Sequence, residues 1–309
     1  MAQPPMSARV CLIFVPVAGH AKAGEDLLTI RRLLTPFVQL DIYVTTVNMG
    51  AGQIAQRVRN HGFDLIVAAG GDGTVSAVAD VVAGTYQAIG ILPQGTANVF
   101  AKRLGIPTDL QAACRTLLTG CDRYVDVVEC NGQPMIASLS IGFEAEAVNS
   151  LSQSDKKRLR IWAYPYAQLR QLWGGLHPFK ADIEVNGEKR VVSASAITVA
   201  NAVSKFTLLA QGPGRILPDD GQVSVTIVDP KSRWSALICG FVLLGAGLFQ
   251  RPARHPAITY FRTCDLRIET TPPQTVTLDG DRIESVPFEI HCRPRSLRVV
   301  VPQDSARVN

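Results

Sequence analysis

The chain has 309 residues, of which 47% are hydrophobic and 18% are charged, and its formal net charge is +5. This composition is typical of a globular protein, and the length favours two domains because a single core stops growing near about 250–300 residues. The basic excess is too weak to indicate nucleic-acid binding, but it is compatible with polyphosphate substrates or an anionic membrane surface. The seven cysteines form no CxxC pair, so we expect free thiols in a reducing compartment and neither a zinc site nor a disulfide framework.

The first part of the chain alternates apolar runs with segments of helical spacing. Buried strands are predicted at residues 10–16, 40–45, 64–69 and 88–92, and helices at 23–34, 50–60 and 75–82. This alternation predicts a parallel sheet with helices on both faces, which is a Rossmann-like arrangement. In such sheets ligands bind beyond the carboxyl ends of the strands, and glycine-containing loops are expected there at residues 15–19, 70–74 and 93–98.

The third predicted strand leads into Gly70-Gly71-Asp72-Gly73-Thr74, and a predicted helix follows. A turn of this kind gathers backbone N–H groups and a helix N-terminus in one concave place, which suits a phosphate. A carboxylate repels a bare phosphate, so Asp72 indicates that a metal ion or a proton transfer lies between them. We therefore interpret the turn as a nucleotide-phosphate loop of a kinase. A tight strand–helix turn with a solvent-facing aspartate is the alternative.

After residue 120 the pattern changes to short runs rich in Val, Ile and Thr, separated by turn signals. Strands are predicted at 125–129, 135–141, 181–185, 191–200, 222–228, 257–261, 266–270, 274–278, 288–292 and 297–301. These runs predict an antiparallel β-sandwich. We accordingly expect an α/β domain over residues 1–127 and a sandwich domain over residues 128–309, whose end returns to the first domain.

Two helical insertions are expected within the sandwich. Residues 234–249 are 16 residues without a charge, whereas a membrane span needs about 20. A buried core helix is the favoured interpretation of this segment, and a monotopic membrane contact is the alternative. The basic and aromatic residues 156–164 are interpreted as a solvated helix end, with contact to an anionic bilayer as the alternative.

Three motifs resemble those of one family. The glycine turn at residues 70–74 is followed by Pro93-Gln94-Gly95-Thr96-Ala97-Asn98, and Leu278-Asp279-Gly280-Asp281 comes near the C-terminus. In this order they resemble the diacylglycerol kinase catalytic-domain family, which includes bacterial soluble lipid kinases, sphingosine kinases and ceramide kinases. The resemblance implies an α/β nucleotide domain, a β-sandwich lipid domain, and transfer of the γ-phosphate of ATP to a hydroxyl of a diacylglycerol, sphingoid or phosphatidylglycerol lipid.

The resemblance also implies roles for individual residues. Residues implied to contact ATP are Gly19, Thr46, Gly70, Gly71, Asp72, Gly73, Thr74, Val75, Ser76, Gly95, Thr96 and Asn98. Those implied to hold a structural Mg²⁺ are Leu217, Asp220 and Gln222, an oxygen-only set that suits a hard cation. Asp281 stands where the family has a proton-accepting glutamate. Asp72 is expected to bind Mg²⁺ or to act as the alternative base, with Asp279 as a third candidate.

Several residues depart from the family pattern. Val15 and Val99 replace polar residues of the family loops, and Asp281 is one methylene shorter than the usual glutamate. A shift of about 1 Å in a catalytic group can cost about 10²-fold in rate. These departures support a second hypothesis, a catalytically weak nucleotide- or lipid-binding homologue. An NAD kinase, which shares the glycine turn, is a third.

The expected location of the protein in the cell follows from its N-terminal residues and its expected lipid substrate. Residues 1–9 lack the pattern of a signal peptide, so we expect a cytoplasmic protein that contacts the membrane surface peripherally to reach its lipid. Nucleic acid is not expected as a partner, and a homodimer is left open.

Overall fold

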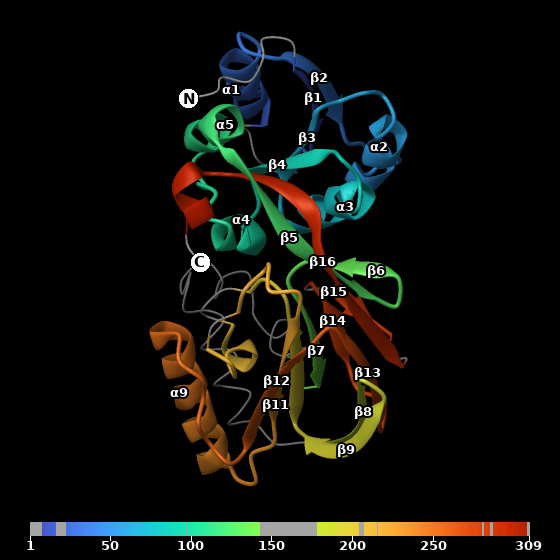
Figure 1. Ribbon diagram of the computed structural model, residues 1–309, viewed down its shortest axis with the longest axis vertical. Coiled ribbons are helices and arrows are strands. Elements are labelled where there is room, and N and C mark those ends of the chain that lie inside the picture. The colour runs from blue at the N-terminus through green and yellow to red at the C-terminus, as the bar shows by residue number, and fades with distance from the viewer. Residues whose placement is uncertain are drawn as a thin grey trace. The chain divides into compact units, whose positions relative to one another are not determined.

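The computed structural model describes residues 8–16, 23–96, 98–142, 178–203, 207–214, 216–279, 281–284 and 287–307. The chain forms two compact units (Figure 1). The N-terminal unit comprises residues 1–127 and 294–309, and the sandwich unit comprises residues 128–293. Each unit has its own hydrophobic core, so the two are described separately.

The N-terminal unit is built on a parallel sheet. Its elements are β1 (Arg9–Phe14), α1 (Ala23–Leu34), β2 (Gln39–Val44), α2 (Ala51–Val58), β3 (Leu65–Gly70), α3 (Asp72–Val82), β4 (Ala88–Pro93), α4 (Val99–Arg103), α5 (Leu110–Thr119) and the 3₁₀ helix η3 (Gln303–Arg307). The strands lie in the order β2-β1-β3-β4, and the end of β16 (Phe288–Val301) pairs in parallel with β4. The predicted parallel sheet is confirmed, while α4 and α5 were not expected.

Helices cover both faces of this sheet. On one face α1 packs beside α5, and on the other α2 packs beside α3 (Figure 1). Strands β1, β3 and β4 are buried along almost their whole length, because they have helices on both sides. This double burial explains why the strands read in the sequence as continuous apolar runs.

The sandwich unit consists of antiparallel strands with one long helix. Its elements are the last part of β5 (Cys121–Cys130), whose residues up to Val127 belong to the N-terminal unit, then β6 (Gln133–Met135), β7 (Ser138–Gly142), β8 (Phe179–Val185), β9 (Glu188–Ala194), β10 (Ala196–Ala200), the 3₁₀ helix η2 (Leu208–Ala210), β11 (Val223–Val228), α9 (Arg233–Phe249), β12 (Ile258–Thr263), β13 (Asp265–Thr271), β14 (Val276–Leu278), β15 (Asp281–Ile283) and the first part of β16. One sheet has the order β12-β11-β10-β7-β14-β15. In the other, β16 pairs with β13, β13 with β8, and β8 with β9.

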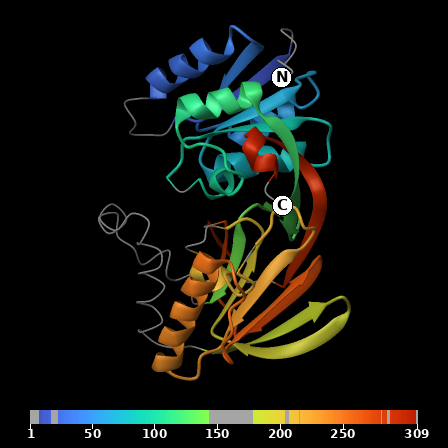
Figure 2. The same cartoon turned by 60° about the vertical axis from the view of Figure 1, so that its left-hand side comes forward.

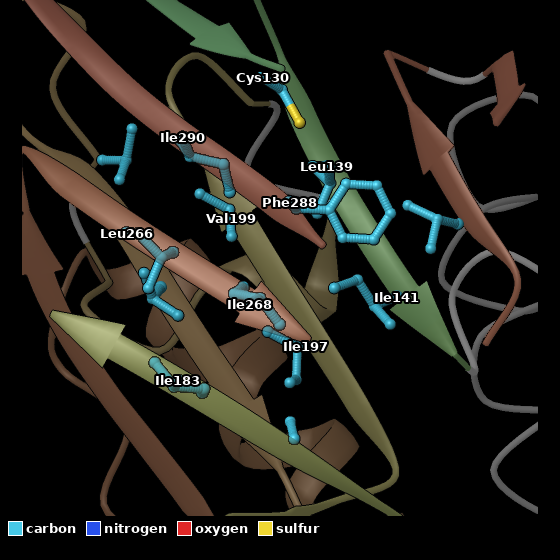
Figure 3. Close-up of a cluster of buried hydrophobic side chains, with 14 of the residues drawn as sticks. Cys130, Leu139, Ile141, Ile183, Ile197, Val199, Leu266, Ile268, Phe288 and Ile290 are labelled. Carbon is cyan, nitrogen blue, oxygen red and sulfur yellow. The ribbon is translucent and has the colours of Figure 1, made fainter. Parts of the chain in front are cut away.

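The core of the sandwich unit is made by side chains that alternate along the strands. Leu139 and Ile141 of β7 and Phe288 and Ile290 of β16 belong to one buried cluster (Figure 3). Strand β13 alternates strictly between exposed and buried residues, as expected where one side of a sheet faces a core and the other faces solvent. The predicted antiparallel sandwich is confirmed.

Some predicted strand boundaries were wrong. The runs 135–141 and 191–200 each form two strands, because the chain leaves the ladder at residues 136–137 and changes sheets at Ser195. The runs 288–292 and 297–301 are instead one strand, β16, which contains Pro294 and a left-handed residue, Arg295 (φ +48°). The spacing of apolar residues is a local property, so it does not show where a strand changes the strand with which it pairs.

Helix α9 begins at Arg233, one residue before the uncharged stretch. Ala236, Cys239, Leu243 and Ala246 lie on its buried face and pack within the sandwich unit. None of the helices that the structure describes is long and apolar enough to cross a membrane. Burial was correctly expected for one face of α9 only, and residues 156–164 lie outside the described residues.

Candidate functional site

The glycine turn joins β3 to α3 at the carboxyl edge of the parallel sheet. Gly71 is the N-cap of α3 and is extended (φ −88°, ψ −174°), and the N–H groups of Thr74 and Val75 donate back to its carbonyl oxygen at 3.0 and 3.1 Å. The first N–H groups of an α-helix have no partner within the helix. This end of α3, which carries the positive end of the helix dipole, therefore favours an anion. The helix starts at Asp72, three residues earlier than expected.

The turn packs directly against the loop that follows β4. A Cβ atom placed at Gly95 would lie 2.6 Å from the Cα of Gly71 and 2.8 Å from Oδ1 of Asn98, so a larger residue does not fit. The N–H of Gln94 donates to the carbonyl of Gly70 at 2.9 Å, which ties the same two loops together. At Gly73, by contrast, a Cβ would meet no atom within 4 Å. The turn is therefore closed on the side of Gly95 and open at Gly73.

Asn98 shapes the second loop. Its backbone is left-handed (φ +46°), which asparagine tolerates better than most residues. The N–H of Gly95 donates to its Oδ1 at 2.9 Å, and its Nδ2 donates to the carbonyl of Gly95 at 2.8 Å. With 7% of its surface exposed, Asn98 has a structural task, because its amide closes the turn that precedes α4.

Asp72 connects the two helices. Its Oδ1 accepts a hydrogen bond from the N–H of Phe100 at 3.2 Å, and Phe100 is the second residue of α4. A carboxylate in the first turn of a helix is stabilised by the helix dipole, and here the N-termini of α3 and α4 converge on the same carboxylate. The sequence did not reveal this contact, because α4 has five residues, too few to show a helical period.

One polar group in this region has no partner within the described chain. The side-chain nitrogen of Gln94 is buried and makes no hydrogen bond there. Buried polar groups are nearly always hydrogen-bonded, so each exception calls for an explanation, such as a ligand or a water. Gln94 is itself the second residue of the Pro93–Asn98 motif. Its place in this motif is the sequence signal that could have identified it as a candidate site residue.

The other residues that were expected to contact ATP lie at several separate places in the N-terminal unit. Thr46 is exposed beyond β2, where its backbone pairs with Met49. Thr96 is exposed, and the side chain of Val75 is buried in the core. Gly19 lies outside the described residues. Because β1 lies between β2 and β3, the strand order reverses next to the glycine turn, and such switch points are where α/β sheets bind ligands.

Asp279 has a visible structural task in the sandwich unit. Its carboxylate accepts three hydrogen bonds, from the N–H groups of Ile136 (2.8 Å), Ala137 (2.8 Å) and Ser138 (2.9 Å). These bonds explain why the chain leaves the strand ladder between β6 and β7. Asp281 follows in β15 and pairs with Leu278 of β14, and its side chain is outside the description.

The carboxylate of Asp220 is engaged on both oxygens. The N–H of Gln222 donates to Oδ1 at 3.1 Å, and Nη1 of Arg262 donates to Oδ2 at 3.2 Å. Side chains of Arg262 and Asp220 are 33% and 19% exposed. The guanidinium already supplies a positive charge at this carboxylate and would repel a cation there. Arg262 therefore competes with a cation for the one carboxylate of the predicted Mg²⁺ set, in which Leu217 and Gln222 would contribute backbone carbonyl oxygens. The Mg²⁺ site at these three residues stays a prediction.

Comparisons with known proteins match both parts of the chain. The family "Diacylglycerol kinase catalytic domain" matches residues 9–130, and "YegS C-terminal NAD kinase beta sandwich-like domain" matches residues 137–301. An uncharacterised protein of Synechocystis sp. PCC 6803 is 33% identical over 306 residues, which is 96% of this chain and 70% of the relative. The diacylglycerol kinase of Bacillus subtilis is 27% identical over 96% of this chain and 98% of its own length.

A solved structure shares the fold. The crystal structure of a diacylglycerol kinase from Bacillus anthracis superposes with a TM-score of 0.77 over 95% of this chain and 96% of its own, at 23% identity. At this level of identity the likeness concerns the fold alone.

The two glycine environments predict opposite outcomes for one substitution. Gly95→Ala should lower the free energy of unfolding by about 1–3 kcal/mol, because the new methyl overlaps Gly71. Gly73→Ala should leave stability within about 1 kcal/mol, because its methyl meets open space, but should weaken ATP binding if phosphate approaches there. Thermal denaturation and titration calorimetry with ATP measure the two effects. Equal stability losses in both variants would contradict the described packing.

The three hydrogen bonds to Asp279 predict that Asp279→Asn is destabilising. An amide nitrogen would face backbone N–H donors, so we expect a loss of about 3 kcal/mol, since hydrogen bonds to charged groups contribute about 1.5–3 kcal/mol each. Urea denaturation measures this loss. Asp182→Asn, on an exposed position of β8, is the matched control and should change stability little.

The Arg262–Asp220 pair predicts that replacing Mg²⁺ by EDTA leaves the melting temperature of the ligand-free protein unchanged. Arg262→Ala should lower stability by about 1–2 kcal/mol, and Mg²⁺ should then restore part of it. Arg267→Ala, which breaks the more exposed pair with Glu289, is the control and should cost about 0.5 kcal/mol or less. A wild-type melting temperature that falls in EDTA, together with no such fall in Asp220→Ala, would show that a cation binds at Asp220.

Proposed function

Because the chain belongs to the diacylglycerol kinase catalytic-domain family, we propose that it is an ATP-dependent lipid kinase. The reaction would transfer the γ-phosphoryl group of ATP to a lipid hydroxyl, and ADP would leave. The acceptor class is a diacylglycerol, a sphingoid base or a phosphatidylglycerol. Kinase chemistry itself follows from the family, and the use of ATP and the choice of lipid are the proposed parts.

The convergence of α3 and α4 on Asp72 is the observation that most supports ATP binding. The N-terminus of α3 attracts a phosphate, and the N–H of Phe100 at the start of α4 holds the Asp72 carboxylate beside it. The open side at Gly73 leaves room for a phosphate to approach the backbone, and the buried amide of Gln94 is a donor that a bound nucleotide would satisfy. Gly19, Thr46 and Thr96 complete the proposed ATP contacts.

Phosphoryl transfer asks a protein mainly to position the groups and to stabilise charge. We propose that Asp72 binds the Mg²⁺ that accompanies ATP, because a carboxylate beside phosphate oxygens is a preferred Mg²⁺ environment. That ion would neutralise charge on the phosphates. Asp281 is the proposed acceptor of the hydroxyl proton. Asp279 becomes the weakest of the three candidates, because backbone donors already engage its carboxylate.

The lipid would bind in the C-terminal domain of residues 128–309, which contains the sandwich unit, while residues 1–127 would bind the nucleotide. Peripheral contact with a membrane surface from the cytoplasm would deliver the lipid. The direct test is incubation with radiolabelled ATP and a total lipid extract, followed by identification of the labelled product. A labelled lipid would support the proposal and would name the acceptor.

A catalytically weak homologue is the second candidate, and Val15, Val99 and the short side chain of Asp281 are the residues that favour it. It predicts ATP binding without lipid-dependent turnover in the same assay. An NAD kinase is the third candidate, and the shared glycine turn and the family name of the C-terminal match are the points in its favour. Consumption of NAD with ATP would support that activity over the lipid kinase.

Asp72→Asn separates the chemical task of this residue from its structural one. The amide oxygen can still accept the hydrogen bond from Phe100, so stability should stay within about 1 kcal/mol of the wild type. Lipid phosphorylation should fall by at least about 10²-fold, because the charge that binds Mg²⁺ or takes the proton is lost. Initial rates and thermal denaturation measure the two. Full activity in this variant would refute the proposed role of Asp72.

A further inference from the structure

Helix α9 presents a continuous apolar stripe to solvent. Its exposed residues are Trp234 (71%), Ile238 (50%), Phe241 (64%), Leu248 (45%) and Phe249 (77%). Apart from the last, they follow one another at intervals of four, three and seven residues, which places them on one face of a helix. Figure 2 shows α9, in orange, beside the strands of the sandwich unit, with one side turned away from these strands. Contiguous exposed apolar surface of this kind marks an interaction site.

The stripe is exposed although α9 itself is well packed against the sandwich unit. The opposite face of α9 is buried, with Ala236, Cys239 and Leu243 against residues of η2, β10 and β11. The helix is thus already docked on its own unit by small residues. The large residues are left on the outer face, where solubility alone would favour polar side chains. A second apolar partner therefore explains them better than the core does.

The charges around α9 indicate what that partner is. Residues 230–264 contain no Asp or Glu but five basic residues, of which Lys231 is paired with Asp229 and Arg262 with Asp220. Arg233 is exposed at the start of the helix, and Arg251 and Arg254 are exposed just after its end. An apolar helix face flanked by arginines suits the interface of an anionic bilayer, where aromatic side chains enter the headgroup region and cations meet lipid phosphates.

We propose that α9 lies in the plane of an anionic membrane surface and inserts its outer face into the headgroup boundary. Its 17 residues give a contact about 25 Å long. A second copy of this chain is a poorer occupant, because an antiparallel pair of such helices would bring Arg233 of one copy beside Arg251 and Arg254 of the other. The surface would bring the proposed kinase to its lipid, but the inference stands on the helix and is tested without ATP.

The test is sedimentation of the full chain with vesicles, at equal protein concentration and without nucleotide. Vesicles of equal parts phosphatidylglycerol and phosphatidylcholine are compared with vesicles of phosphatidylcholine alone. The stripe variant, Trp234→Ser/Phe241→Ser/Phe249→Ser, removes the three aromatic side chains of the stripe, and Arg251→Ser/Arg254→Ser removes charge alone. The control, Leu28→Ser/Val191→Ser, removes two exposed apolar side chains elsewhere (66% and 68%).

Wild type and control should bind the anionic vesicles at least about tenfold more tightly than the stripe variant, because several large apolar side chains leave water on binding. The arginine variant should bind less tightly than the wild type to anionic vesicles and equally to neutral ones. Melting temperatures near the wild-type value exclude unfolding as the cause. Equal binding by stripe variant and wild type would overturn the proposal. So would a wild-type dimer in light scattering that the stripe variant dissociates, which would identify a second copy as the occupant.

Discussion

The close contact of Gly71 with Gly95 is the constraint on which the candidate site depends. No Cβ fits at Gly95, so only glycine allows the loops after β3 and β4 to touch. That contact brings the start of α4 to the start of α3, and the N–H of Phe100 then reaches Asp72. A glycine-rich turn is usually explained by the ligand it admits. In this chain the packing between the two loops explains the glycine at position 95. Among the glycines of these two loops, only at Gly73 would a Cβ meet no neighbouring atom, so a ligand has room there.

The aspartates that the sequence singled out differ in their surroundings. Asp279 holds three backbone N–H groups and orders the link between β6 and β7. Asp220 is paired with Arg262 and with a backbone N–H. Asp72 lies where two helix N-termini meet. Because the carboxylates of Asp279 and Asp220 are already engaged by hydrogen bonds, the proposed mechanism assigns its chemical roles to Asp72 and Asp281.

Helix α9 is apolar on two opposite faces that have different surroundings in the fold. Its sequence is apolar all round, which usually means burial on all sides. The fold buries only the face with small residues and leaves Trp234, Phe241 and Phe249 outside. The arginines at both ends make the outer face suited to an anionic interface. The predicted burial therefore holds for one side of the helix, and the proposed membrane contact concerns the other side.

The sequence determined the layers of the fold and the place of the glycine turn, since strand and helix periods are local properties. It placed α1 at its observed bounds, and the paired glycine loops at the carboxyl edge of the sheet. Only the tertiary structure decided the partners of individual side chains. The bond from Ile136 to Asp279 joins residues 143 positions apart, and Arg262 meets Asp220 across 42. No local pattern encodes such contacts, because they depend on how the strands pair.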